Sequence, residues 1–231
     1  MAIIAFRLNE NLYLRDPQGT ELGQNIIRES IKLVDTMGFE QFTFKKLADA
    51  IASTEASVYR YFENKHRLLI YLIDWYWTWL DHRLEFAVQN MRDPREKLRA
   101  CLHVLIEEKK YDPGFAFVDE PALQRIVTAE FDKTYLTKQV DEDNRDGLFL
   151  PYKSVCKRIA EVAKEINPTY PYHHTLVSTV ILSANHQLYY ARHLPSLTDI
   201  HSEPQEDYGR LYDFCESLMM KALSQSTETQ S

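Results

Sequence analysis

The hydroxyl, aromatic and cationic side chains of Phe42–Lys65 are of the types that contact nucleic acid, and their spacing is typical of a helix-turn-helix. Apolar residues recur at steps of three and four over Phe44–Ile51, which places them on one face of a helix. Thr43 is the predicted N-cap of that helix, and small residues after it allow a sharp bend. Thr54 is predicted to cap a second helix over Glu55–Phe62. In a helix-turn-helix the second helix reads base edges and the first crosses the backbone, so this stretch predicts a DNA-binding element.

The second helix is expected to bury Val58 and Phe62, which lie four residues apart. The residues expected at its outer face are Glu55, Ala56, Ser57, Tyr59, Arg60 and Tyr61. Arg60 is the only long cation among them, so it either reads a guanine through O6 and N7 or clamps a phosphate. The carboxylate of Glu55 either accepts a hydrogen bond from a cytosine amino group or interacts favourably with the positive N-terminal end of its own helix.

The pair Leu47-Ala48, the run Ser57–Phe62 and Lys65 resemble the N-terminal signature of TetR/AcrR-family transcriptional regulators. The resemblance covers roughly residues 22–69. It departs from the family pattern at Ala52, where glycine is common. Carried over by position, the resemblance implies phosphate or groove-edge contacts for Thr43, Thr54, Ser57, Tyr59 and Lys65, with Lys45 beside them, and base-facing positions for Ala56, Arg60 and Tyr61.

The fold that this resemblance implies is all-α, with an N-terminal three-helix DNA-binding domain and a C-terminal helical domain for ligand binding and dimerisation. The boundaries expected are an arm over residues 1–20, a helix-turn-helix domain over 21–67, an effector-binding domain over 68–224 and a flexible tail over 225–231. The implied function is that of a homodimer that binds an inverted repeat in double-stranded DNA and is released by a small-molecule effector.

Two other functions stay open at this point. One is an all-helical ligand-binding or small catalytic protein whose helix-turn-helix contacts another protein. The other is a regulator without a ligand. No sequence motif of a catalytic or cofactor site is present, so neither an enzyme nor a cofactor is expected.

Composition favours a compact helical protein with a local basic patch. The chain has 231 residues, 45% of them hydrophobic, only 6 glycines and a formal net charge of −7. That charge excludes a general, charge-driven nucleic-acid binder. From residue 43 to 67, however, five Lys and Arg residues stand against three Asp and Glu residues, which suits specific binding.

The chain from residue 64 to about 91 predicts one long helix, because neither proline nor glycine interrupts it. Its centre is apolar nearly all round, and Trp75 and Trp79 share a face. These rings are either core residues or one wall of an effector pocket. The pocket residues expected from helix faces are Trp75, Trp79, His103, Phe131, Tyr152 and Asn185.

Further helices are predicted over Arg95–Lys110, Glu120–Phe131 and Pro151–Ile166, with a solvated polar loop over Asp141–Gly147. The last two helices are expected near residues 171–193 and 205–224. By analogy with the family, their apolar faces are predicted to pair with a second copy. The interface residues expected are Leu176, Val180, Ala184, Leu188, Leu211, Cys215 and Leu218.

The arm over residues 1–20 either packs on the rest of the molecule or carries Arg7 and Arg15 into the minor groove. No metal site is expected, because the spacing of the eight histidines suits no shared ion. The three cysteines are expected to be reduced core residues. No signal segment or membrane span is recognisable, so a cytoplasmic protein is expected.

Overall fold

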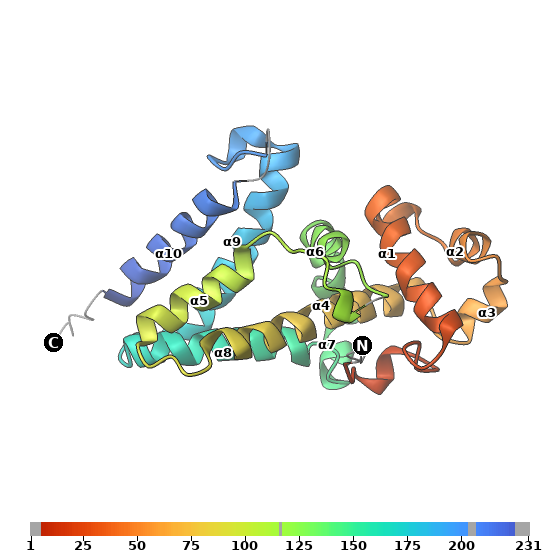
Figure 1. Ribbon diagram of the computed structural model, residues 1–231, viewed down its shortest axis with the longest axis horizontal. Helices are drawn as coiled ribbons and strands as arrows, with labels where there is room; N and C mark the ends of the chain where they lie inside the picture. The colour runs from red at the N-terminus through yellow and green to blue at the C-terminus, as the bar shows by residue number, and fades with distance from the viewer. Residues whose placement is uncertain (1–5, 116, 203–206, 225–231) are drawn as a thin grey trace. The chain divides into compact units, whose positions relative to one another are not determined.

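The computed structural model describes residues 6–115, 117–202 and 207–224, and all regular structure in these ranges is helical (Figure 1). The chain forms two compact units. The first comprises Met1–Trp79 and Lys109–Pro151, and the second comprises Leu80–Glu108 and Tyr152–Ser231. The predicted all-α fold with an N-terminal helix-turn-helix is confirmed.

The first unit begins with the 3-10 turn η1 (Glu10–Leu12) and three helices that lie together in Figure 1: α1 (Glu21–Gln41), α2 (Phe44–Ala50) and α3 (Glu55–Tyr59). The side chain of Thr20 caps α1 by accepting from the backbone N–H of Gly23. Gly38 has φ 76°, a left-handed conformation that interrupts α1 and that glycine adopts without steric cost.

The rest of the first unit contains the start of α4 (Lys65–Val88), the 3-10 turn η2 (Pro113–Phe115), α6 (Glu120–Tyr135) and α7 (Val140–Arg145). Helices α1 and α6 pack against each other, and Arg125 of α6 holds both carboxylate oxygens of Asp35 at 2.9 and 2.8 Å. Glu130 of α6 accepts a hydrogen bond from the backbone N–H of Phe39 at 3.1 Å. Helix α6 is thereby fixed to the first helix of the DNA-binding element.

The second unit contains the end of α4, α5 (Pro94–Ile106), most of α8 (Leu150–Ile166), α9 (His173–His193), the 3-10 turn η3 (Pro195–Leu197) and α10 (Tyr208–Ser224). Asp81 on α4 pairs with Arg158 on α8 at 2.7 Å. Arg99 on α5 pairs with Glu216 on α10 at 2.6 Å. The three cysteines are free, and Cys101 and Cys215 are buried in the core as predicted.

Several predicted elements differ from those observed. Helix α3 ends at Tyr59 instead of Phe62, and α5 ends at Ile106 instead of Lys110. Residues 141–145 belong to α7 instead of a loop. The segment is solvated as predicted except at Asp143, whose buried carboxylate lies 2.9 Å from Arg67. The tail over residues 225–231 and the start predicted for the last helix at residue 205 lie outside the described residues.

The predicted dimer faces of α9 and α10 need correction. Six of the seven residues are at most 8% exposed in the single chain, because the broad apolar stripe of each helix packs into the core of its own unit. The six buried residues are Leu176, Val180, Ala184, Leu188, Leu211 and Cys215. Only Leu218, 36% exposed, remains available to a second copy.

Candidate nucleic-acid interface

Helices α2 and α3 are joined by a tight turn whose geometry is set by local interactions. Thr43 accepts from the backbone N–H of Lys46, and Thr54 accepts from that of Ser57, so both predicted N-caps are confirmed. A cap of this kind stabilises a helix by about 1 kcal/mol. Between the helices Ala52 has φ 50°, the left-handed conformation in which a Cβ costs roughly 1 to 2 kcal/mol.

The exposed residues of this pair of helices are mostly polar. Tyr59 is 47% exposed, and its ring packs edge-on against Phe44 at 4.9 Å between centroids, so the ring is held in place while about half of the side chain stays accessible. Arg60 is exposed, and its guanidinium donates to the hydroxyl of Ser57 at 3.0 Å. The other predicted contact residues that lie exposed are Thr43, Lys45, Thr54, Glu55 and Ala56.

Tyr61 does not face outward, and its predicted orientation was wrong. Its side chain is 2% exposed, and its hydroxyl lies 2.8 Å from the hydroxyl of Thr20. The physical reason is the early end of α3: beyond Tyr59 the chain leaves the helical periodicity, so the spacing no longer places residue 61 on the outer face. Ser57 is also buried, at 8% exposure, beneath Thr54 and Arg60.

Lys65 forms an intramolecular cap that sequence reasoning missed. Its ammonium donates to the backbone carbonyls of Phe39, Glu40 and Phe42 at 3.1, 3.3 and 3.2 Å, and it lies 4.6 Å from the centroid of the Phe39 ring. Carbonyls at a helix end lack partners within the helix, and a cation satisfies them. Lys65 therefore fixes the start of α4 to the end of α1.

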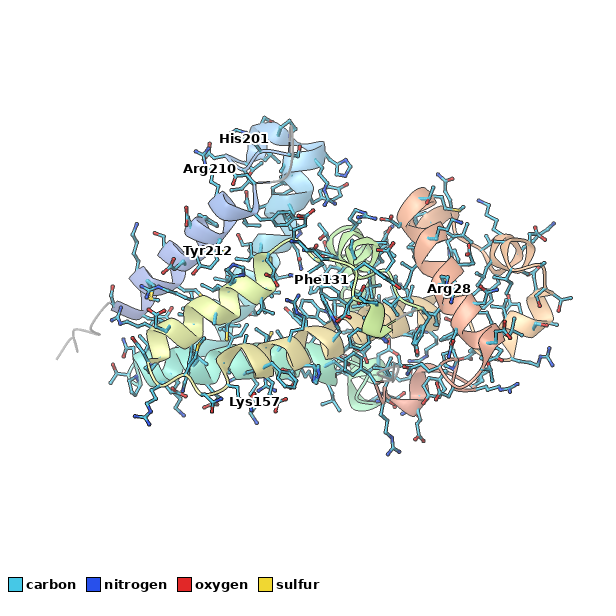
Figure 2. All side chains as sticks on the ribbon, viewed as in Figure 1. Arg28, Phe131, Lys157, His201, Arg210 and Tyr212 are labelled. Atoms are coloured by element: carbon cyan, nitrogen blue, oxygen red, sulfur yellow. The ribbon has the colours of Figure 1, made fainter. Side chains whose placement is uncertain are left out.

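The six predicted pocket residues are divided equally between the two units. In the first unit Trp75 and Trp79 stack at 6.5 Å between centroids, which confirms that they share a face of α4. Trp75 also packs against Phe115, with 5.4 Å between the ring centroids. The ring of Phe131 on α6, labelled in Figure 2, packs against Trp77 of α4 with 6.3 Å between the centroids.

The other three predicted pocket residues, His103, Tyr152 and Asn185, belong to the second unit. The side chain of His103 is 68% exposed and lies 3.1 Å from Glu107. Tyr152 and Asn185 are half-buried. That all six line one effector pocket remains a prediction.

Sequence reasoning also missed Asp74, although a lone carboxylate in the apolar run of α4 was a signal that could have found it. The residue is 1% exposed, and neither carboxylate oxygen has a hydrogen-bond partner. Burial raises the pKa of Asp74 to about 8, since an ion without partners is poorly stabilised in the interior.

Comparison with known proteins agrees with this geometry. Residues 26–72, from α1 into α4, match the family described as "Bacterial regulatory proteins, tetR family". These residues form a TetR-family N-terminal domain. The matched region contains all the exposed residues of α2 and α3 named above.

Relatives with similar sequences include nucleoid occlusion factors SlmA. That of Vibrio campbellii is 29% identical over 82 residues, 36% of this chain and 42% of that protein. That of Edwardsiella ictaluri is 32% identical over 91 residues, 39% of this chain and 42% of that protein. The chain spans about half the length of the curated relatives that it matches.

Solved structures with the same fold cover most of the chain. AibR in complex with isovaleryl coenzyme A and operator DNA has a TM-score of 0.57 at 16% identity, covering 84% of this chain and 97% of AibR. The fatty acid degradation regulator FadR from Bacillus halodurans has a TM-score of 0.58 at 15% identity, and the match covers 86% of this chain and 93% of FadR. At these identities the likeness establishes the fold alone.

In the part of the chain that the structure describes, no group of three or more His, Cys, Asp or Glu side chains is placed to hold a metal ion. None of the described helices is both long enough and apolar enough to cross a membrane.

Proposed function

We propose that this chain is a sequence-specific DNA-binding transcriptional regulator of the TetR family that acts in the cytoplasm as a homodimer. The observation that carries the proposal is the exposed surface of α2 and α3, with Tyr59 and Arg60 outward on a capped, rigid scaffold. A protein with formal charge −7 has little general attraction for DNA, so a local surface of this kind must supply the affinity.

In this proposal α3 enters the major groove and α2 crosses the phosphate backbone. Arg60 at the end of α3 contacts a guanine or a phosphate, and the hydroxyls of Thr43, Thr54 and Tyr59 donate to phosphates. Lys45 adds a positive charge at the start of α2. Tyr61 and Lys65 are left out of the contact surface because their polar atoms are engaged within the chain.

Dimerisation would use the outer face of α10 in place of the buried stripe. Phe214 and Leu218 are 45% and 36% exposed and lie four residues apart, so they share a face of this helix. A two-fold axis at this face would bring the same pair from a second copy against it. The two recognition helices would then contact two half-sites one or more helical turns apart.

Release of DNA by a small-molecule effector is the regulatory part of the proposal. The contacts of Arg125 with Asp35 and of Glu130 with the backbone of Phe39 join α6 to α1 within the first unit. An effector that binds more tightly to a state with α6 shifted would therefore shift the helix-turn-helix as well.

The test is fluorescence anisotropy of the full chain with labelled duplexes from the region upstream of its own gene. Wild-type protein should bind one duplex at least 100-fold more tightly than a scrambled one, and Arg60→Ala should weaken specific binding about 10-fold or more. Lys157, an exposed cation on α8 (Figure 2), is the matched control, and Lys157→Ala should bind as wild type. Equal binding of wild type to every sequence would refute the proposal.

A further inference from the structure

The described part of the N-terminal arm, residues 6–20, packs against the rest of the first unit at several points. Near its start the side chain of Asn9 donates to the backbone carbonyl of Asp146, after α7, at 2.8 Å. Near its end the backbone N–H of Leu14 donates to the carbonyl of Tyr61 at 2.8 Å. Pro17 lies so close to α1 that a Cβ on Gly23 would meet its carbonyl oxygen at 2.2 Å. The arm is therefore a fixed part of this unit.

The two arginines of the arm differ in their surroundings. The guanidinium of Arg7 is 3.0 Å from the carboxylate of Glu10, which neutralises its charge locally. The guanidinium of Arg15 lies 5.4 Å from the centroid of the Tyr61 ring and is exposed. Within the described ranges no ion pair includes Arg15, so its positive charge faces solvent uncompensated.

The position of Arg15 places this charge beside the recognition helix. The backbone N–H of its neighbour Leu14 is hydrogen-bonded to the carbonyl of Tyr61. Tyr61 directly follows the exposed Arg60 at the C-terminal end of α3. The adjacent carboxylate of Asp16 accepts from the backbone N–H of Gln18 at 2.9 Å and is held in that turn. A free cation is thus fixed next to the surface assigned to DNA.

We propose that Arg15 contacts the DNA phosphate backbone, so that the arm extends the DNA interface beyond the end of α3. This inference rests on the proposed function. Phosphates recur every 3.4 Å or so along each strand, so a cation beside an inserted recognition helix meets the flanking backbone. The contact carries no sequence information, and it adds affinity and orientation.

The test measures the affinity of the full chain for its operator duplex and for a scrambled duplex across a series of salt concentrations. The variants are Arg15→Ala, Arg15→Lys and, as the matched control from the same arm, Arg7→Ala. Each phosphate contact contributes about −0.9 to the slope of log K against log salt. In a homodimer Arg15→Ala should therefore make this negative slope less steep by about 1.8 and weaken binding to both duplexes by a similar factor. Arg15→Lys and Arg7→Ala should keep the wild-type slope.

An unchanged salt slope in Arg15→Ala would overturn the inference alone. If Arg15→Ala and Arg15→Lys also lose affinity equally, Arg15 only supports the Tyr61 ring. Circular dichroism and thermal unfolding confirm that each variant is folded. If wild-type protein binds no duplex specifically, the proposed function itself fails, and that result is distinct from both.

Discussion

The buried carboxyl group of Asp74 predicts a strong dependence of stability on pH. In the folded chain burial raises the pKa of Asp74 to about 8, whereas an exposed aspartate in the unfolded chain titrates near its ordinary value of 3.8. Between these values the unfolded state has lost the proton and the folded state has kept it. The unfolded state therefore binds fewer protons, and the free energy of unfolding falls as the pH rises.

The size of the effect follows from proton linkage. One proton bound only in the folded state lowers the free energy of unfolding by about 1.4 kcal/mol for each pH unit. From pH 5 to pH 8 this amounts to roughly 4 kcal/mol, a large part of the stability of an ordinary domain. Asp74→Asn has the same shape and no charge, so it should remove this part of the pH dependence.

The measurement is urea unfolding of wild type and Asp74→Asn at pH 5 and pH 8, at one protein concentration. The advantage of the variant over wild type should be about 4 kcal/mol greater at pH 8 than at pH 5. Burial also raises the pKa of Glu120, to about 7, and this changes stability in the same direction. Glu120 is present in both proteins, so its effect cancels in the difference. An advantage that is equal at the two pH values would show that Asp74 is ionised in the folded state, and the reasoning would be wrong.

Three further predictions concern the helix-turn-helix. Ala52→Gly should raise the free energy of unfolding by up to about 1 kcal/mol, because glycine relieves the left-handed strain; a lower thermal midpoint would contradict this. Thr54→Ala should lower the free energy of unfolding by about 1 kcal/mol in urea titrations, since the backbone N–H of Ser57 loses its cap, and an unchanged midpoint would argue against the cap. Lys65→Ala should lower the free energy of unfolding by about 1 to 3 kcal/mol, because it leaves backbone carbonyls unpaired. The slope of log K for DNA binding against log salt should stay unchanged, and a less steep slope would show that Lys65 contacts a phosphate.

Features set by neighbouring residues could be predicted from the sequence. The caps at Thr43 and Thr54 depend on backbone groups within three residues. The stacking of Trp75 on Trp79 follows from helical spacing alone. For the same reason the order of the helices and the helix-turn-helix could be read before the structure was known.

Features set by distant residues could not be predicted in this way. Asp143 is helical and buried because Arg67, 76 residues earlier, pairs with it. Lys65 caps carbonyls 23 to 26 residues away, and Tyr61 is turned inward toward Thr20. The apolar stripes of α9 and α10 showed that each helix has a buried face. They did not show whether the chain itself or a second copy covers that face.

The central claim is that the exposed surface around Tyr59 and Arg60 binds DNA as a two-fold pair. Footprinting of the upstream region of the chain's own gene, with wild type, Tyr59→Ala and Arg60→Ala, tests it most directly. The account predicts protection of two symmetric half-sites by wild type and much weaker protection by both variants at the same concentration. Equal protection by all three proteins, or protection of a single half-site by a monomer, would contradict it.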